Sequence, residues 1–310
     1  MCLSIRGIKM YDLIIIGAGP SGITAAVYAA RKKMDFLVLT DDIGGQTIWS
    51  SNVENYTGYQ FITGAELAQK FEQHLRQYDI TVRENEPVIS LEKNNGFFTA
   101  TTAKAAYQSR AVIIASGKRS RELGVSGEKE FRNKGLTYCA TCDGPLFNGK
   151  DVAVVGNGNS ALDAALQLAR ISPRVYIINN VSALVGDSVM REKVVSSKNV
   201  TVINDATVTA ILGDKLVTGI RIKRNNSQQE IPVQGVFVEI GLIPNSDFVS
   251  LVKKNDLGEI EVDCRNSTSL EGIFAAGDVT SVPEKQIIIA AGEGAKACLS
   301  AFRYLAQHKF

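Results

Sequence analysis

Unbroken apolar runs alternate with a glycine turn and a helix-forming stretch near the start of the chain. The run YDLIIIG (11–17) predicts a strand that is buried on both faces of a parallel sheet. The turn GAGPSG (17–22) follows, and alanines between positions 25 and 30 favour a helix that ends at about Lys33. A second apolar run, MDFLVLT (34–40), predicts the next strand. Together these segments predict a β-α-β unit.

The same order of strand, glycine turn and helix returns in KDVAVVGNGNSALDAALQLA (150–169), and RVYIIN (174–179) predicts the strand after it. The two units begin about 140 residues apart, which fits two domains and not a short repeat. Other apolar stretches predict further strands and one long helix. These are SRAVIIASG (109–117), GVFVEIGLIPNSD (235–247) and GIFAAGDVT (272–280) as strands, and residues 285–307 as the helix.

The end of the chain has no further dinucleotide turn, so it is expected to complete the first domain. The predicted fold class is therefore α/β, with two Rossmann-like, three-layer dinucleotide-binding domains, the second inserted in the first. The first domain comprises residues 1–117 and 245–310, and the inserted domain comprises residues 118–244. The first recognisable element begins at Met10, so residues 1–9 are expected to be dispensable.

Composition narrows the classes of protein. The chain has 310 residues, of which 45% are hydrophobic, so two sizeable cores can be buried. Its 34 basic and 32 acidic residues give a net charge of +2, which argues against a nucleic-acid partner. No apolar run approaches the length of about 20 residues that a membrane span needs. Five cysteines, of which only two are close in sequence, do not form a secreted disulfide scaffold, so a reducing cytoplasm is expected.

The first glycine turn has the spacing G-x-G-x-x-G between a strand and a helix. The first glycine permits the tight turn, the second lets the backbone approach a pyrophosphate, and the third allows close packing of helix on strand. The helix N-terminus favours the negative charge of that pyrophosphate. The residues expected at this site are Gly17, Gly19, Pro20, Ser21 and Gly22. Asp41 or Asp42 lies about twenty residues on, where a ribose partner belongs, although an exposed turn acid explains either one equally well.

Cys139 and Cys142 form a C-x-x-C pair that is followed at once by Asp143. A metal site needs more ligands than the pair supplies, and His74 and His308 are isolated, so no metal is expected. A buried inert pair is the other alternative, but the surrounding residues favour a turn. A redox pair that exchanges electrons through a mixed disulfide is the preferred interpretation, with the carboxyl moving the thiol proton. The remaining cysteines, Cys2, Cys264 and Cys298, are predicted to be structural.

The second glycine turn has the spacing G-x-G-x-x-A and predicts a nicotinamide dinucleotide site. Its candidate residues are Gly156, Gly158, Asn159, Ser160, Ala161 and Asn179. The strand after such a turn normally ends in an acid for a ribose hydroxyl or in arginines for a 2′-phosphate. This chain offers Asn179, Asn180 and Val181 instead. Either the amide hydrogen-bonds a ribose, or the domain keeps the shape of a nucleotide site without using it.

The order of the motifs resembles that of the low-molecular-weight thioredoxin reductases, which are FAD-dependent class II pyridine nucleotide-disulfide oxidoreductases. The resemblance covers nearly the whole chain from Met10. The matching motifs are GAGPSG, GGQ (44–46), VENYTG (53–58), CATCDG (139–144), the second glycine turn and FAAGDV (274–279). CDGPLFNGK (142–150) and residues 284–305 are also similar to the flavoprotein component of alkyl hydroperoxide reductase. That flavoprotein has an additional thioredoxin-like N-terminal part, for which no room is expected here.

The resemblance implies FAD in the first domain and a thioredoxin or thioredoxin-like protein as the partner. It implies that Cys142 faces the flavin, that Cys139 attacks the partner disulfide, and that Asp143 is the acid/base. It further implies a homodimer and a domain rotation that presents the pair to flavin and to partner in turn. The residues that it implies for FAD, beyond the glycine turn and Asp41, are Gly45, Gln46, Asn55, Gly117, Gly277, Asp278, Gln286 and Ile287.

The chain departs from the family at positions 179–185. Members that use NADPH have a His-Arg-Arg run and a further Arg where this chain has Asn179, Asn180, Val181 and Val185, and amides and valines cannot bind a 2′-phosphate as clustered cations do. Reduced ferredoxin, which some relatives use, is therefore the favoured electron donor. The alternatives are an NAD(P)H-dependent reductase, a reductase of a peroxidase or glutaredoxin-like partner, and a flavin-binding redox sensor without turnover.

Overall fold

The computed structural model describes residues 9–50, 53–94, 96–225 and 227–308. The chain divides into two compact units. The first comprises Met1–Trp49, Tyr56–Arg119 and Ile243–Phe310, and the second comprises Ser50–Asn55 and Ser120–Leu242. The sequence-based boundaries lie two residues from the main division points, at 117 against 119 and at 244 against 242. The expected start at residues 1–9 falls almost wholly outside the described residues.

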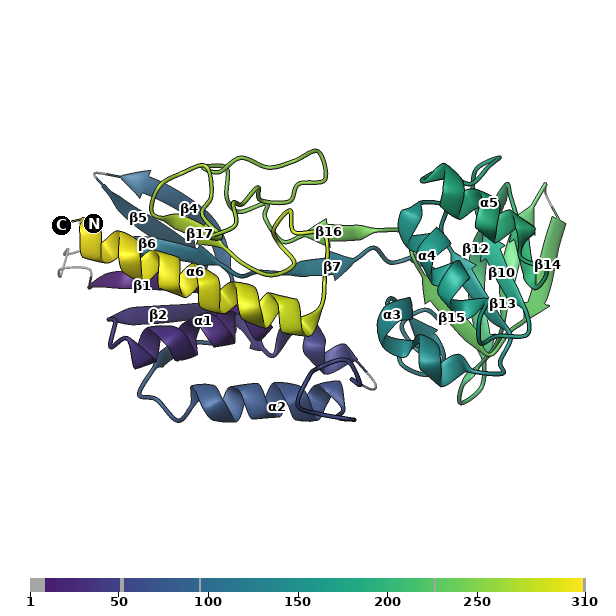
Figure 1. The fold of residues 1–310 in the computed structure, drawn as a ribbon, viewed down its shortest axis with the longest axis horizontal. Helices are drawn as coiled ribbons and strands as arrows, with labels where there is room; N and C mark the ends of the chain where they lie inside the picture. Colours follow the sequence, from purple (N-terminus) through teal and green to yellow (C-terminus); the bar gives the residue numbers. More distant parts are fainter. Residues whose placement is uncertain (1–8, 51–52, 95, 226, 309–310) are drawn as a thin grey trace. The chain divides into compact units, whose positions relative to one another are not determined.

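A seven-stranded sheet forms the centre of the first unit. Its strands are β1 (Met10–Ala18), β2 (Phe36–Ile43), β3 (Thr81–Arg83), β4 (Val88–Asn94), β5 (Phe97–Thr102), β6 (Ala106–Ile114) and β17 (Ile273–Ala275). The order is β3-β2-β1-β6-β5-β4, with β17 paired to β6 (Figure 1). Strands β2, β1, β6 and β17 are parallel, whereas β4 and β5 are antiparallel additions. The helices are α1 (Pro20–Arg31), α2 (Gly64–Leu75) and α6 (Ile287–Gln307), with a 3-10 turn η1 at Gly45–Trp49.

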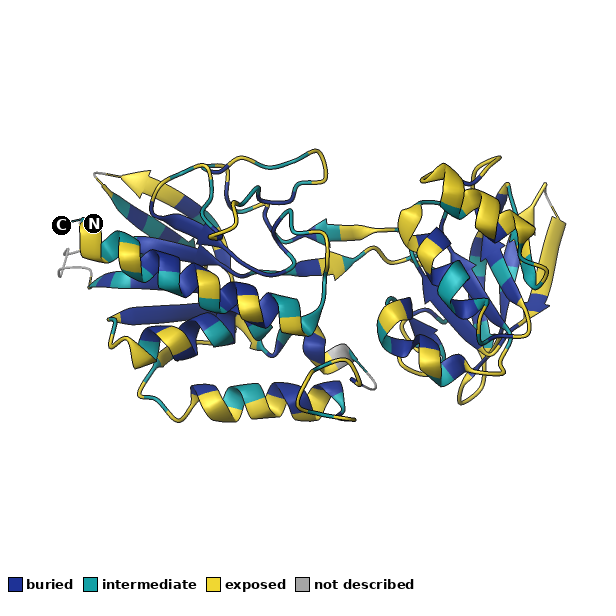
Figure 2. Ribbon diagram, in the orientation of Figure 1, coloured by how far each residue is buried: buried dark blue, intermediate teal, exposed yellow. Residues whose placement is uncertain are grey.

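The apolar run of β1 is buried on both of its faces, as its sequence predicts. On one face, Leu13 and Ile15 pack with α1 and α6 in a core that includes Ala297. On the opposite face, Ile14 and Ile16 belong to a core that includes Val249 and Val252. Helices α1 and α6 run side by side, and the buried residues of both face the sheet (Figure 2). Helix α1 begins directly after β1, and the Cβ position of Gly277 lies 2.7 Å from Ser21 Oγ on α1 and 3.4 Å from Ala290 Cβ on α6, so the first turns of both helices approach the same loop.

The second unit has three layers of its own. A parallel sheet has the order β11-β10-β9-β15-β8, and an antiparallel sheet has the order β12-β13-β14. The parallel strands are β8 (Leu136–Thr137), β9 (Val152–Val155), β10 (Val175–Ile178), β11 (Val200–Ile203) and β15 (Gly235–Val238). The antiparallel strands are β12 (Ala206–Gly213), β13 (Val217–Arg224) and β14 (Ser227–Pro232). The helices are α3 (Ala140–Asp143), α4 (Asn159–Leu168) and α5 (Ser188–Ser196), with a 3-10 turn η2 at Gly144–Phe147.

The chain passes between the units through two short paired strands, β7 (Lys118–Ser120) and β16 (Leu242–Pro244). Alternation of parallel strands and helices in both units confirms the predicted α/β, Rossmann-like fold class. Among the helices of the described residues, none combines the length and apolar character that crossing a membrane would require.

Candidate active site

The three glycines of the first turn each do what the spacing predicts. Gly17 has φ +103°, and a Cβ placed there would lie 2.4 Å from Ala115 O of the neighbouring chain segment. A Cβ at Gly22 would lie 1.9 Å from Gly17 O, so only glycine lets α1 pack this closely on the turn. A Cβ at Gly19 would meet no atom within 4 Å. The space beside Gly19 is therefore open for a group that approaches the backbone.

Helix α1 begins without a side-chain cap. Its N-cap is Gly19, followed by Pro20, and no side-chain hydrogen bond caps it. In contrast, α2 begins with a complete capping box in which Thr63 and Glu66 exchange hydrogen bonds. The first N–H groups of α1 are thus free to bind an anion, as the N-terminus of a helix favours.

Residues from three further segments gather around this turn. A Cβ at Gly45 would lie 3.3 Å from Gly19 Cα, and a Cβ at Gly277 would lie 2.7 Å from Ser21 Oγ. The Gly277 N–H donates to Glu293 Oε2 at 2.8 Å, so α6 fixes the turn before Asp278. Glu293 is 5% exposed and was not predicted from the sequence, since nothing in its helical context marks it out.

Asp278 lies next to a buried group of charges. Burial raises the pKa of Asp278, and the nearby cations Lys285 and Lys118 oppose that effect. Lys118 and Glu259 form a buried ion pair, Lys285 Nζ lies 3.4 Å from Glu259 Oε1, and Lys285 donates to Thr280 O at 2.6 Å. Burial also works to raise the pKa of Glu259, but the bonds from Lys118 and Asn255 outweigh it and lower that pKa. The turn that carries Asp278 is therefore held by charged side chains.

The other residues predicted for FAD lie in β2, in η1, in two loops and at the start of α6. Asp41 is exposed at the end of β2, and the neighbouring Asp42 accepts from the Gly45 N–H at 3.2 Å. Gln46 and Asn55 are exposed, and Gly117 has φ +66° with open space at its Cβ position. Gln286 is the N-cap of α6 and Ile287 is its first residue, and no side-chain hydrogen bond caps this helix either.

The redox turn, Cys139–Asp143, is a disulfide loop with a buried carboxyl beside it. Cys139 and Cys142 are joined by a disulfide, and the Cys142 N–H lies 3.1 Å from Cys139 Sγ. Asp143 is 5% exposed and accepts a hydrogen bond from Thr137 Oγ1. Burial raises its pKa, which the Thr137 bond opposes. Its other oxygen, Oδ1, is buried and has no hydrogen-bond partner among the described residues. A buried carboxyl with a free oxygen is well placed to take or give a proton.

Ala140, between the two cysteines, is held at both of its peptide groups. Its N–H donates to Glu239 Oε1 at 3.3 Å, and its C=O accepts from Gln167 Nε2 at 3.0 Å. Burial raises the pKa of Glu239 to about 7, the Ala140 bond opposes this, and Asp163 adds to it. Neither Glu239 nor Gln167 was predicted, because both are distant from the pair in sequence.

The second glycine turn has the same design as the first. A Cβ at Gly156 would lie 2.3 Å from Glu239 O and 3.0 Å from Ala161 Cβ, whereas a Cβ at Gly158 would meet nothing within 4 Å. Helix α4 starts at Asn159 without a side-chain cap. Ser160 is exposed on its first turn. The turn itself therefore retains the shape that a dinucleotide needs.

Asn179, the residue at the specificity position of this second site, forms hydrogen bonds within the protein. Asn179 is fully buried, its Nδ2 donates to Asn204 Oδ1 at 3.0 Å, and its Oδ1 accepts from the Val181 N–H at 3.1 Å. Asn159 Oδ1 accepts from the Asp187 N–H at 2.8 Å. The amide of Asn179 thus fixes the following loop instead of facing solvent, where a ribose would have to meet it.

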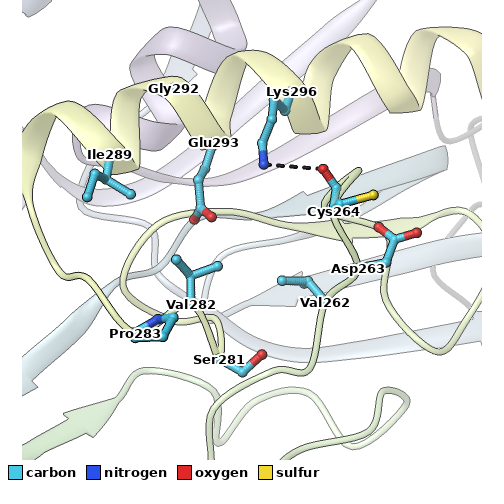
Figure 3. A pocket seen from close by; sticks show the side chains of 10 residues that line it. All are labelled: Val262, Asp263, Cys264, Ser281, Val282, Pro283, Ile289, Gly292, Glu293 and Lys296. Atoms are coloured by element: carbon cyan, nitrogen blue, oxygen red, sulfur yellow. Dashed lines mark hydrogen bonds between the residues drawn. The ribbon is translucent and has the colours of Figure 1, made fainter.

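A cavity of about 580 Å³ lies elsewhere in the first unit, between α6 and two loop segments (Figure 3). Its lining includes Cys264, Glu293 and Lys296, and Lys296 Nζ donates to Cys264 O at 3.3 Å. Of the cysteines predicted to be structural, Cys264 is exposed and Cys298 is buried, whereas Cys2 lies outside the described residues. Burial raises the pKa of Cys298 to about 12. None of the residues predicted for FAD lines this cavity.

An uncapped glycine turn for a dinucleotide in one unit and a disulfide beside a buried carboxyl in the other are the features expected of the FAD-dependent disulfide oxidoreductase class. The chain belongs to the pyridine nucleotide-disulphide oxidoreductase family, whose model matches residues 11–294. FAD is the cofactor of this class, and the open space at Gly19 with the free N–H groups of α1 fits its pyrophosphate.

Two relatives show how far the similarity extends. The chain is 43% identical to a component of the alkyl hydroperoxide reductase of Pseudomonas putida, over 96% of this chain. It is 41% identical to a protein named NADH dehydrogenase of Bacillus subtilis, over 95% of this chain. The alignments cover only 58% of the length of each relative.

Solved structures match over nearly their whole length. Thioredoxin reductase from Streptococcus pyogenes superposes with a TM-score of 0.92 at 33% identity, covering 97% of this chain and 100% of that chain. A ferredoxin-flavin thioredoxin reductase from Clostridium acetobutylicum superposes with a TM-score of 0.54 at 29% identity, covering 97% of this chain and 100% of that chain. These matches confirm the family resemblance that the motifs indicate.

Proposed function

We propose that this protein reduces the disulfide of thioredoxin or of a thioredoxin-like protein, with electrons that pass through Cys142 and Cys139. The observation that carries the proposal is the Cys139–Cys142 disulfide beside the buried Asp143 carboxyl, whose free oxygen lies in the same turn. FAD, when bound, supplies the two-electron carrier that returns this disulfide to a dithiol.

The residues of the chain then perform the transfer to the partner. The Cys139 thiolate attacks one sulfur of the partner disulfide, which forms a mixed disulfide and releases one partner thiolate. Asp143 takes the proton of the Cys139 thiol before the attack and gives it to that partner thiolate, and the Cys142 thiol proton goes to the second partner sulfur in the next step. Cys142 attacks Cys139 in the mixed disulfide, so that the Cys139–Cys142 disulfide returns and the second partner sulfur leaves as a thiol. The partner gains two electrons and two protons, and the pair loses them.

For the electron donor we favour reduced ferredoxin. The burial of Asn179 supports this proposal, because its amide is committed to Asn204 and Val181 and does not offer a ribose a partner. The likeness to a ferredoxin-flavin thioredoxin reductase is in line with it.

NAD(P)H is the second candidate donor. The intact geometry at Gly156 and Gly158 favours it, as does the likeness to a relative named NADH dehydrogenase. An anaerobic titration of flavin absorbance with NADPH, NADH and reduced ferredoxin in turn separates the two. Bleaching by ferredoxin alone supports the proposal, and rapid bleaching by either nucleotide overturns it.

Purified partner disulfides test the substrate. Multiple turnovers with thioredoxin are expected, whereas turnover only with a peroxidase or glutaredoxin-like protein would reassign the partner. A single flavin oxidation without turnover would indicate a redox sensor. The family resemblance also supports a homodimer and a cytoplasmic location, and sedimentation of the FAD-loaded protein tests the first of these.

A further inference from the structure

Glu239 is positioned to act on the redox turn, although it lies almost 100 residues away in the chain. It follows β15 directly, and its backbone N–H donates to Val155 O of β9 at 2.8 Å. This places its backbone against the second glycine turn, where Glu239 O would lie 2.3 Å from a Cβ at Gly156. Its side chain meanwhile reaches the Ala140 N–H at 3.3 Å.

Ala140 lies between the two cysteines in the sequence and in the redox turn. It stands directly after Cys139 and begins the single helical turn that ends at Asp143. Two side chains bind the peptide groups of this buried residue: Gln167 donates to the Ala140 C=O, and Glu239 accepts from the Ala140 N–H. We call these two hydrogen bonds the clamps on Ala140. Both bonds therefore act on the backbone between Cys139 and Cys142.

The surroundings of Glu239 contain few other charges. Asp163 on α4 is exposed and raises the pKa of the Glu239 carboxyl, and Asp143 on α3 is the other buried acid of this region. The cysteine thiols join them once the disulfide is reduced. Strands β9 and β15 contribute only apolar residues and glycine, and the glycine turn between β9 and α4 has no titratable side chain.

We propose that Glu239 is a positioning residue for the Cys139–Cys142 pair: its carboxylate fixes the Ala140 N–H and keeps the disulfide slow to open, and protonation of the carboxyl relaxes this hold. A hydrogen bond to an ionised acceptor is about twice as strong as one to a neutral acceptor, so the ionised form is the tighter clamp. A negative charge in the buried site also disfavours the thiolate that leaves when the disulfide is attacked. Because burial raises the pKa of Glu239 to about 7, both forms are present near neutral pH.

The proposal rests on the redox role of the pair, but its test does not depend on electron donor or partner. A neutral, water-soluble phosphine reduces a disulfide by attacking one sulfur, and water then supplies the oxygen of the phosphine oxide and the two thiol protons. The rate at which phosphine oxide forms, followed by phosphorus NMR on the FAD-loaded protein, reports the first attack on the pair. A free peptide with the sequence CATC, measured in parallel, corrects for the titration of the phosphine itself.

The comparison is wild type against Glu239→Gln between pH 5.5 and 8.5. Near pH 5.5 both proteins have a neutral side chain at position 239, so their rates should agree within about twofold. Near pH 8.5 the wild type should react about fivefold more slowly than the variant, with one transition close to pH 7. Glu230→Gln, which removes an exposed carboxylate of the same unit, is the matched control and should follow the wild type.

A ratio of wild-type to variant rates that stays constant across this pH range would overturn the proposal. If Glu239→Gln does not fold, the rate of phosphine oxide formation for wild type, divided by the rate for the CATC peptide, decides alone. This ratio should fall as the pH rises through about 7, and a ratio that does not change with pH refutes the inference. Asp163→Asn should move the transition to lower pH, because it removes the charge that raises the Glu239 pKa. Failure to reduce thioredoxin would contradict the proposed function without changing this pH profile.

Discussion

Gly19 and Gly22 of the first turn should respond differently to substitution by alanine. A Cβ at Gly22 would lie 1.9 Å from Gly17 O, a backbone atom that cannot move aside. Gly22→Ala should therefore destabilise the apoprotein by about 3 kcal/mol or more. A Cβ at Gly19 meets no atom within 4 Å, and its φ of −76° suits alanine, so Gly19→Ala should change stability by no more than about 1 kcal/mol.

The effect of Gly19→Ala should appear in FAD binding. Its methyl group fills the space through which a pyrophosphate reaches the N–H groups of α1, and losing one hydrogen bond to a charged group costs about 1.5–3 kcal/mol. FAD affinity should therefore fall by about ten- to a hundredfold. Titrating each apoprotein with FAD by flavin fluorescence, beside thermal melts of the same samples, gives both quantities. An FAD affinity of Gly19→Ala equal to that of wild type would refute the assignment of this turn, as would a loss of apoprotein stability as large as that of Gly22→Ala.

Four further substitutions test other parts of the account. Cys142→Ser should retain FAD absorbance but abolish thioredoxin turnover, and substantial residual turnover would sink its assigned role. Asp143→Asn should lower turnover by about 10²-fold or more with FAD binding unchanged, because it removes the proton carrier; steady-state kinetics with both variants give the answer. Glu259→Gln leaves the buried cations Lys118 and Lys285 without their carboxylate, so the free energy of unfolding should fall by about 3–5 kcal/mol. Urea unfolding measures this, and an unchanged midpoint urea concentration would contradict the buried pair. Burial raises the pKa of Glu239 from 4.5 to about 7, so ionising this carboxyl in the folded protein costs at most about 3 kcal/mol of stability. The cost is absent below about pH 4.5 and complete above pH 7. Glu239→Gln should therefore be more stable than wild type at pH 9 but not at pH 4.5, which amide exchange of residues 235–240 can check.

Part of the crowding at the glycine turns comes from distant parts of the chain: Ala115 O crowds Gly17 and Glu239 O crowds Gly156, and only the structure shows these contacts. The crowding of Gly22 by Gly17 O is local to the turn. The turns could still be predicted from sequence, because the spacing of the glycines within one short segment marks a strand that turns directly into a helix. The buried apolar run of β1 and the helix after it were predicted for the same reason. Only their ends differ, with α1 ending at Arg31 and β2 extending to Ile43.

The side chains that support the site could not be predicted in this way. Glu293, Glu239 and Thr137 act on residues that the motifs do mark, but tertiary contacts bring them there, and no spacing in the chain records those contacts. Asn179 illustrates the opposite case. The sequence shows which charge is missing, whereas only the structure shows that the amide is buried and bonded to Asn204.

In the proposed reaction, electrons leave this flavoprotein through Cys142 and Cys139. The most direct measurement is to reduce the FAD-loaded protein chemically in the absence of oxygen, mix it with oxidised thioredoxin, and follow flavin absorbance together with new thioredoxin thiols. Wild type is expected to reoxidise its flavin as two thiols appear per thioredoxin disulfide, and Cys142→Ser is expected to do neither. Reoxidation of the flavin by thioredoxin at an undiminished rate in Cys142→Ser would contradict this proposal.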